Sequence, residues 1–329
     1  MSISYILPIK WDDDQSLDEL TRYLTYLSPH TDLIIVDGST PANFETHHRL
    51  WADLGVHIMP HAHCRCLNGK VSGVLTGLSV AKHHHVIIAD DDVRYELSQF
   101  HDIDKLLVHH QLVSPQNYFQ PCPWHAKWDT SRSLLNLAWA HDYPGTLAIQ
   151  RDFICALGGY DGDVLFENLE LTRTVKAGGG KVLYKNELFV RRLPPSAKHF
   201  WSQRVRQAYD DYAQPARLAF FIVLLPLLAT LAAYAPWLIP LLLILAVAIA
   251  EVGRRKNGGQ RVFAASCSFF APAWLMERSI CTWVALFQKL VKGGVSYNRA
   301  TISKAANPTG TIRRKLTTGS SHDAPIYRK

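Results

Sequence analysis

Three consecutive aspartates are the residues whose type and spacing most clearly could do chemistry. Asp90-Asp91-Asp92 directly follows the short apolar run Val86–Ala89. Closely spaced carboxylates bind Mg²⁺ or Mn²⁺, and such a metal neutralises a diphosphate. Asp90 and Asp92, as alternate residues at a strand end, could present one carboxylate to the ribose side and one to the metal, and both are candidate metal ligands. Aspartates also cap turns after strands, but the position after an apolar run favours the metal-binding interpretation.

Two further residues could belong to the same site. Asp37 ends the run DLIIVD and precedes Gly38-Ser39-Thr40, so its carboxylate could accept hydrogen bonds from a nucleobase edge. The alternative is that this segment is only a turn. Lys70 begins the helix expected before the aspartates and could face phosphates, although a solvated lysine is the competing interpretation.

Downstream residues could complete a group-transfer site. Glu167 and Glu170, one helical turn apart in FENLE, are candidates for a general base. In the segment SQRVRQ, Gln203 and Arg206 are expected on one helix, where the arginine could stabilise a leaving diphosphate. The alternative is that the basic residues only flank a membrane segment on its positive side.

The elements that must position these residues alternate in type. Short β-type runs and amphipathic helical runs follow one another over the first 110 residues, which predicts a mostly parallel sheet of the nucleotide-binding type. Such sheets bind ligands at the carboxyl ends of their strands, where Asp37 and the aspartates lie. The expected strands are 4–9, 32–37, 56–59 and 86–89, and the expected helices are 17–27, 44–54 and 70–82.

Residues 114–195 have a different amino-acid composition. They are rich in Pro, Trp and Tyr, which predicts loops of an acceptor-side subdomain grafted on the sheet. Within them, Leu169, Thr172 and Val175 have helical spacing and are followed by Gly178-Gly179-Gly180, so we expect a helix that stops there and leads into the strand KVLY.

The hydrophobic block 216–250 is too long for one crossing of a roughly 30 Å hydrocarbon core and is long enough for two short ones. Ala235-Pro236-Trp237 is the natural turn. Arg217 at one end and Arg254-Arg255-Lys256 at the other predict a hairpin with both ends on the cytosolic side. The alternative, a buried soluble hairpin, is disfavoured because long uncharged runs are rare in soluble folds.

A third apolar stretch, 263–290, is interrupted by Glu277-Arg278, which favours a helix lying in the membrane interface over another crossing. Residues 252–329 carry 14 Lys and Arg against 2 Asp and Glu, whereas residues 1–251 carry 21 against 26. This asymmetry argues against nucleic acid as a partner and for contact of a basic, flexible tail with anionic membrane lipids.

The cysteines and the amino-terminal sequence indicate the compartment. The six cysteines are scattered, and MSISYILPIKWDDD lacks the pattern of a signal peptide, so we expect a cytosolic front part with reduced thiols. The segment HAHCRC, with Cys64 and Cys66, could suggest a zinc site. Since no second ligand pair follows at zinc-finger spacing, ordinary strand and loop residues are the favoured interpretation.

The ordered series IIVDGST, NGKVSGVLTGLSVAKHHHVIIADDDV, GTLAIQRDFICALGGYDGDVLFENLELTRTV and QRVRQ before a hairpin resembles the family 2 glycosyltransferases, and most closely their membrane-bound ceramide-glucosyltransferase-like branch. The resemblance covers roughly residues 1–300. It implies an A-type glycosyltransferase fold, an inverting transfer and a required divalent metal. By the same resemblance Asp37 contacts the base, Asp90 and Asp92 form the D-x-D motif, and Gln203 and Arg206 match the Gln-x-x-Arg signature.

Two departures from that family pattern matter. The family usually has Glu-Asp where this chain has Glu167-Asn168, and the missing Asp is normally the base. Either Glu167 serves, or the base comes from elsewhere. The signature's Trp, which binds the acceptor glycan in processive synthases, is Gln207 here, although Trp201 lies nearby in the sequence.

We therefore expect a multi-pass protein of the cell inner membrane or plasma membrane, with a cytoplasmic catalytic domain (1–212), a transmembrane hairpin (213–253), and an interfacial helix with a basic tail (254–329). The expected activity is that of a metal-dependent hexosyltransferase moving a sugar from a nucleotide sugar, with a UDP-sugar favoured, to a membrane lipid. The alternatives are a processive polysaccharide synthase subunit, or a catalytically inactive membrane scaffold that binds nucleotide sugars.

Overall fold

Short apolar runs in the first ninety residues form the strands and helices that their periodicity predicts. The strand positions are almost wholly buried, and α1 buries Leu20, Leu24 and Leu27 along one face. The elements are β1 (Ile3–Ile9), α1 (Leu17–Leu27), β2 (Asp32–Asp37), α2 (Pro41–Trp51), β3 (Val56–Ile58), the short 3₁₀ turn η1 (Ala62–Cys64), α3 (Gly69–Val80) and β4 (His85–Ala89).

The structure, a computed structural model, describes residues 2–12, 16–293, 295–297 and 300–318. It divides into two units built from discontinuous segments. The first unit comprises 1–115, 144–185 and 307–329, and the second comprises 116–143 and 186–306. The expected boundaries at 212 and 253 differ from these units, since the hairpin shares a unit with segments that precede it by a hundred residues.

The sheet has the strand order β3-β2-β1-β4-β7-β6-β8-β5. Pairs β2–β3, β1–β2 and β1–β4 are parallel, as the alternation of strands and helices predicts. Strand β7 (Thr146–Gln150) is antiparallel to both β4 and β6. Ile9 is in register with Asp37, and Ile6 with Ile88, so the carboxyl ends of β1, β2 and β4 lie along one edge.

The composition of residues 114–195 predicted loops, and for much of this stretch that prediction is wrong. The segment holds a 16-residue helix, α5, whose buried face includes the small polar residues Thr130, Ser131 and Ser133 and so lacks a clear apolar stripe. The helix expected around Leu169 is confirmed. The elements are β5 (Val93–Arg94), α4 (Leu97–Leu107), β6 (Leu112–Phe119), α5 (Trp124–Trp139), β7, α6 (Arg151–Ala156), α7 (Glu167–Ala177) and β8 (Val182–Arg192).

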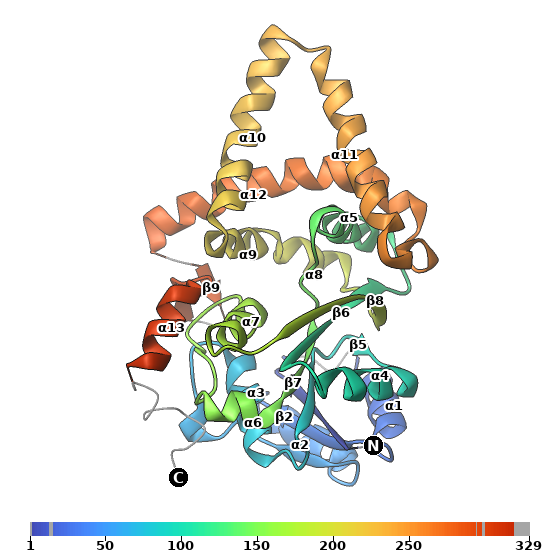
Figure 1. The fold of residues 1–329 in the computed structure, drawn as a ribbon, viewed down its shortest axis with the longest axis vertical. Coiled ribbons are helices and arrows are strands. Elements are labelled where there is room, and N and C mark those ends of the chain that lie inside the picture. Colours follow the sequence, from blue (N-terminus) through green and yellow to red (C-terminus); the bar gives the residue numbers. More distant parts are fainter. Residues whose placement is uncertain (1, 13–15, 294, 298–299, 319–329) are drawn as a thin grey trace. The chain divides into compact units, whose positions relative to one another are not determined.

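The second unit is largely helical. Figure 1 shows α10 and α11 as the two arms of a hairpin, with α12 running across its base. The arms meet at residues 235–237, where the turn was expected. The elements are α8 (Ala197–Ser202), α9 (Arg204–Tyr209), η2 (Asp210–Ala213), α10 (Pro215–Tyr234), α11 (Leu238–Arg255), η3 (Lys256–Arg261), η4 (Ala265–Phe270), α12 (Ala271–Lys292), β9 (Val295–Tyr297) and β10 (Ala300–Ile302).

Within the described residues, α10 is the one helix long and apolar enough to cross a membrane by length and composition, with a mean hydropathy of 2.2. Helix α11 also exposes leucines, namely Leu241, Leu243 and Leu245, but its last turns carry charged residues, Glu251, Arg254 and Arg255. A hairpin of two helices is thus observed, whereas its insertion in a bilayer stays a prediction.

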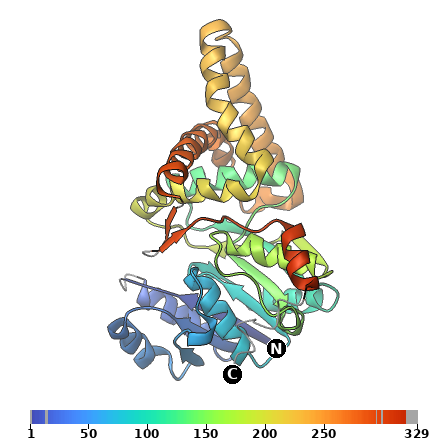
Figure 2. The same ribbon diagram turned by 90° about the vertical axis from the view of Figure 1, so that its left-hand side faces the viewer.

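The carboxy-terminal helix α13 (Thr309–Thr317) belongs to the first unit, where it lies beside α7 (Figure 2). Residues 309–317, expected in a flexible basic tail, are therefore helical. The expectation for residues 319–329 lies outside the described residues.

Close packing of α3 on the sheet depends on glycine. A Cβ added at Gly77 would lie 2.6 Å from Cγ2 of Ile6 and 3.0 Å from its Cδ1. Ile6 belongs to the central strand β1 and is fully buried, so it has little room to move.

We predict that Gly77→Ala lowers the free energy of unfolding by about 1–3 kcal/mol, because overpacking outweighs the gain in helix propensity. Denaturant titration followed by circular dichroism measures the change. Gly310→Ala, in α13, is the matched control, since a Cβ there meets nothing within 4 Å. Equal stability of the two variants would contradict the packing.

Candidate active site

A lysine held between two carboxylates is the centre of the candidate site. Nζ of Lys70 lies 2.5 Å from Oδ1 of Asp90 and 2.8 Å from Oε1 of Glu167. The three side chains come from the start of α3, the end of β4 and the start of α7. All three are partly exposed, with side-chain exposures of 17%, 23% and 17%. The structure thus brings together three of the residues that the sequence singled out.

Asn68 links the start of α3 to the start of α7 through its side-chain hydrogen bonds. Its Oδ1 accepts the backbone N–H of Lys70 and so caps α3. Its Nδ2 donates to the carbonyl of Val164 at 3.0 Å and to Oε2 of Glu167 at 3.4 Å. Since Asn68 is fully buried, these bonds are shielded from water and fix Lys70 relative to Glu167. Sequence reasoning missed this residue, although the Asn-Gly-Lys order is typical of a helix start.

The charge on Lys70 is stabilised by its neighbours. Burial disfavours the ammonium, but Asp90 and then Glu167 outweigh this effect and raise the pKa of Lys70 well above its usual value. A raised pKa means that the contribution to stability is complete below the unfolded value and is lost only at strongly alkaline pH. Lys70 therefore carries a positive charge at any physiological pH.

The other two aspartates differ in their surroundings. Asp91 accepts a hydrogen bond from the indole N–H of Trp11, and its carbonyl accepts one from Arg94. Asp92 is partly exposed, as Asp90 is. Trp11 follows β1 at the same sheet edge, and its backbone N–H donates to Ser39. Its position two residues after a buried strand was the signal that could have marked Trp11.

The donor set fits the divalent metal that the sequence predicts. Asp90 and Asp92 offer carboxylate oxygens, which are the ligands that Mg²⁺ and Mn²⁺ prefer, and neither side chain is sealed from solvent. Lys70 contacts Oδ1 of Asp90, so a metal held by Asp90 and Asp92 would have to share or displace this contact. The metal assignment stays a prediction that the geometry permits.

Asp37 is placed differently from the expectation of direct base contact. Its side chain is 0% exposed. Oδ2 lies 2.6 Å from Nδ1 of His47 and 3.3 Å from Nε2 of His57, while Oδ1 accepts the N–H of Ser39. Contact with a nucleobase would require these partners to move. In the structure, Asp37 orders the loop at the end of β2.

The pKa of Asp37 reflects a competition. Burial raises it, but hydrogen bonds from His57, Ser39 and His47 prevail and lower the pKa to about 2. The carboxylate is therefore ionised and only accepts, so the facing ring nitrogens of His47 and His57 carry the hydrogens.

The second base candidate has a structural role. Glu170 is 1% exposed, and its two oxygens accept the backbone N–H of Asn307 at 2.6 Å and its side-chain amide at 2.9 Å. Glu170 therefore holds the segment that leads to α13. The amide of Asn168 donates to the carbonyl of Pro144 at 2.9 Å, a bond that a carboxylate at this position could not make. Of the acidic residues in FENLE, Glu167 is the one in the charged cluster.

Gln203 and Arg206 lie in the second unit, so their expected role at the diphosphate stays a prediction. Nε of Arg206 donates to Oε1 of Gln203 at 2.6 Å, and Gln203 sits at the junction of α8 and α9 rather than within one helix. The arginine buried in this segment is Arg204, which is 2% exposed.

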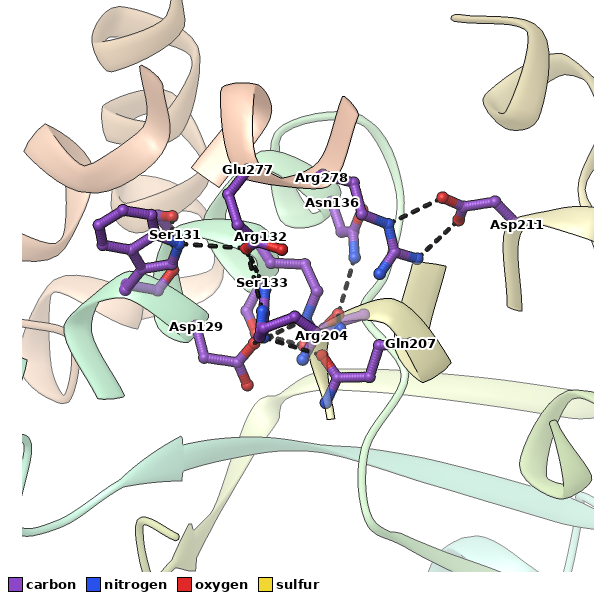
Figure 3. Close-up of polar contacts among 12 residues, drawn as sticks. Asp129, Ser131, Arg132, Ser133, Asn136, Arg204, Gln207, Asp211, Glu277 and Arg278 are labelled. Carbon is purple, nitrogen blue, oxygen red and sulfur yellow. Dashed lines mark hydrogen bonds and ion pairs between the residues drawn. The ribbon is translucent and has the colours of Figure 1, made fainter. Parts of the chain in front are cut away.

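Arg204 belongs to an ionic network at the base of the hairpin (Figure 3). It pairs with Oε2 of Glu277 at 2.7 Å and with Oδ1 of Asp129 at 3.1 Å, and it donates to Gln207 at 2.8 Å. Burial raises the pKa of Asp129, but Arg132 and Arg204 lower it to about 2. Gln207, in place of the signature Trp, thus orients the buried guanidinium.

The same network accounts for the charged pair inside α12. Arg278 makes a two-pronged contact with Asp211, at 2.8 and 2.9 Å, and Arg217 reaches Asp211 at 2.9 Å (Figure 3 shows the first pair). Glu277 and Arg278 are 9% and 3% exposed. Arg278 is thus paired with Asp211, and Oε2 of Glu277 is paired with Arg204. The helix expected in this stretch is observed as α12, whereas its place in a membrane interface stays a prediction.

Comparisons with known proteins give similarity of structure only. No protein-family model matches the chain, and no curated protein does. Among solved structures, the mannosyltransferase PcManGT from Pyrobaculum calidifontis, described in complex with GDP-Man and Mn²⁺, is 15% identical with a TM-score of 0.49. That match covers 99% of this chain and 84% of PcManGT.

Two other matches are more limited. Glucosyl-3-phosphoglycerate synthase from Mycobacterium tuberculosis, with Mn²⁺ and UDP-glucose, is 17% identical at a TM-score of 0.41, over 63% of this chain and 77% of that one. Mannosyl-3-phosphoglycerate synthase from Rubrobacter xylanophilus is 12% identical at 0.40, over 61% and 70%. At these identities and TM-scores, the case for a function depends on the residues of this chain.

We predict that Asp37→Asn is about 2 kcal/mol less stable than the wild type at pH 7, because the native pKa of Asp37 lies below its unfolded value. The contribution is present above the unfolded pKa and is lost as pH falls from about 4 to about 2. Urea titrations across pH 2–7 measure it.

Asp53→Asn, at an exposed position, is the control and should behave as the wild type does. A stability gap for Asp37→Asn that stays constant down to pH 2 would contradict the assigned histidine contacts.

Proposed function

We propose that the chain is a metal-dependent, inverting glycosyltransferase that moves a sugar from a nucleotide sugar to a membrane lipid. The observation that carries this proposal is the Lys70 ammonium held between Asp90 and Glu167 at the carboxyl edge of the parallel strands. Nucleotide ligands bind at this edge in sheets of this type. The sheet, whose β7 runs antiparallel to β4, is compatible with the A-type glycosyltransferase fold that the sequence resembles.

The donor side of the reaction needs positive charge near the diphosphate. Asp90 and Asp92 would hold Mg²⁺ or Mn²⁺, which neutralises the leaving diphosphate when bound. Lys70 adds a permanent cation at the same edge. A bound diphosphate would compete with Asp90 and Glu167 for the Lys70 ammonium. Donor binding would therefore weaken the ion pair between Lys70 and Glu167.

The acceptor side needs a base. Glu167 would take the proton of the acceptor hydroxyl as the hydroxyl oxygen of the acceptor bonds to the anomeric carbon. At the same time, the bond from that carbon to the diphosphate oxygen breaks. The electron pair of the broken bond stays with the diphosphate. Such a single displacement inverts the anomeric centre. Asn168 cannot serve, because its amide does not accept a proton and is bound to Pro144.

A lipid acceptor is supported by the helical unit. An apolar cavity of about 550 Å³ lies among α5, α10, α11 and α12, and this volume is within the range of small-molecule sites. Its walls are leucines and aromatic rings, and Arg217 and Asn136 are its polar lining residues. Nη1 of Arg217 donates to Oδ1 of Asn136 at 3.0 Å. A lipid would match this lining, since its apolar chain could lie against the leucines and rings and its polar head could meet Arg217 and Asn136.

The membrane placement extends this proposal. The hairpin of α10 and α11 would insert in the inner or plasma membrane, with the catalytic unit in the cytoplasm and the basic residues meeting anionic lipids. The alternative, a processive polysaccharide synthase subunit, would need a partner that supplies a channel. The length of the product distinguishes it from a transferase that adds a single sugar. A catalytically inactive scaffold, suggested by Asn168, would bind a donor without transfer.

The donor is tested first. Thermal shifts with UDP-glucose, UDP-galactose, UDP-N-acetylglucosamine and GDP-mannose, each with and without Mn²⁺, should show a metal-dependent rise in Tm for one donor. Transfer of the labelled sugar to a lipid extract then tests the reaction. No metal-dependent shift and no labelled lipid with any donor would refute the proposal.

We predict that Glu167→Gln lowers the rate of transfer by about 10²–10⁴-fold while donor binding persists, because only the general base is lost. Single-turnover assays with labelled donor measure the rate, and thermal shift reports donor binding.

Glu45→Gln, at an exposed position of α2, is the control, and its transfer rate should stay within a few-fold of the wild type. Full activity in Glu167→Gln would exclude Glu167 as the base.

We predict that Ala246→Phe reduces transfer to lipid by at least about tenfold, because the ring would fill the cavity that Ala246 lines, with metal-dependent donor binding unchanged. Initial rates with the lipid extract, beside donor thermal shifts, separate the two effects. Ala248→Phe, exposed on the same helix and outside the cavity lining, should retain wild-type transfer. Equal rates for the two variants would exclude the cavity as the acceptor site.

A further inference from the structure

Three side chains that commonly bind transition metals gather between β3 and α3. His61, His63 and Cys64 each place a potential ligand atom within 4.8 Å of the other two. They lie in and beside the 3₁₀ turn η1, in the HAHCRC segment. Sequence spacing argued against a zinc site here because it looked for a second distant pair of ligands. The turn instead brings one pair of histidines to one thiol.

The donor set selects a class of metal. Two imidazole nitrogens and one thiolate suit Zn²⁺ and similar borderline-soft cations, whereas Mg²⁺ and Mn²⁺ prefer oxygens. In a tetrahedral zinc site with bonds of about 2.0–2.3 Å, ligand atoms lie roughly 3.3–3.8 Å apart. Since the observed ligand atoms lie within 4.8 Å of one another, closing the cluster to that size requires their separations to shorten by at most about 1–1.5 Å. This set is also chemically distinct from the carboxylates of Asp90 and Asp92.

The ligands differ in mobility in a way that permits this closure. Cys64 is 0% exposed, and its backbone N–H donates to the carbonyl of His61 at 3.0 Å. The backbone N–H of His61 donates to Oγ1 of Thr76 on α3, which fixes this residue to the helix. His63 is exposed, so its side chain can rotate to complete a site around the two anchored ligands.

A supporting oxygen is also in place. Metal-bound histidines usually donate their second ring N–H to an oxygen, which fixes the ring's orientation. Oγ of Ser79 lies 3.5 Å from Nδ1 of His61 and itself donates to the carbonyl of Thr76. With Nε2 of His61 as the metal ligand, Ser79 would orient the ring through Nδ1.

Cys66 has a different role, although it is two residues away. Its Sγ donates to the carbonyl of Asn68 at 3.1 Å and lies 3.2 Å from Oγ of Ser72. These bonds hold its thiol against the start of α3. Cys66 therefore provides a matched thiol for comparison with Cys64.

We propose that His61, His63 and Cys64 form a three-ligand site for a zinc-class divalent cation, with the fourth position open to water. On binding, the Cys64 thiol gives its proton to solvent and its sulfur bonds to the metal. The metal would fasten the segment that leads from β3 to Asn68, the residue that caps α3 and fixes Lys70. The site is separate from the proposed donor site and does not depend on it.

Cobalt substitution tests the proposal on the full-length protein after removal of any affinity tag. One equivalent of Co²⁺ per chain should give visible d–d bands and a near-ultraviolet thiolate-to-cobalt charge-transfer band. Zn²⁺ should abolish both, while excess Mg²⁺ should not. The charge-transfer band reports a thiolate ligand, so binding of Co²⁺ to the other histidines of the chain does not produce it.

Variants assign the ligands. Cys64→Ser should lose the charge-transfer band, and His63→Ala, an exposed change that leaves the fold intact, should weaken Co²⁺ affinity by at least about tenfold. Cys66→Ser should retain the wild-type spectrum. Absence of the band in the wild type, its persistence in Cys64→Ser, unchanged affinity in His63→Ala, or its loss in Cys66→Ser would each overturn the proposal. The readout is spectroscopic, so it is independent of transferase activity.

Discussion

The contact of the Lys70 ammonium with Asp90 and Glu167 is the interaction on which the candidate site depends. It joins the start of α3, the end of β4 and the start of α7, three points far apart in the sequence. Without the cation, two carboxylates would face each other in a partly buried place, which is unfavourable. With it, the site has a fixed positive charge and a nearby carboxylate, which are the two features that group transfer from a diphosphate needs.

The parallel half of the fold was predictable because its signal is local. Runs such as DLIIVD and VIIA are buried on both faces, so they appear in the sequence as continuous apolar strands. The rule that ligands bind at the carboxyl edge then indicated Asp90, which the structure places at the end of β4 in contact with Lys70. Helix α5 was missed because its buried face is partly polar and is matched by an ionic network from other helices. No local pattern encodes such partners.

The same distinction applies to individual residues. The sequence could not reveal that His47 and His57, ten and twenty positions downstream, enclose Asp37, because this depends on how α2 and β3 pack. Nor could it separate Arg204 from Arg206. Helical position alone makes both candidates for a functional role, but only Arg204 is buried against Glu277 and Asp129. Gly253 likewise looked ordinary, yet a Cβ there would lie 1.9 Å from the carbonyl oxygen of Leu134.

The central claim is that the cluster around Lys70 and Asp90 binds a nucleoside diphosphate through a divalent metal. Isothermal titration calorimetry with UDP, in the presence of Mn²⁺ or of a chelator, tests it most directly. The account predicts saturable binding of one UDP per chain with Mn²⁺, loss of that binding with chelator, and its loss in Asp90→Asn. Binding that needs no metal, or that is unchanged in Asp90→Asn, would contradict it.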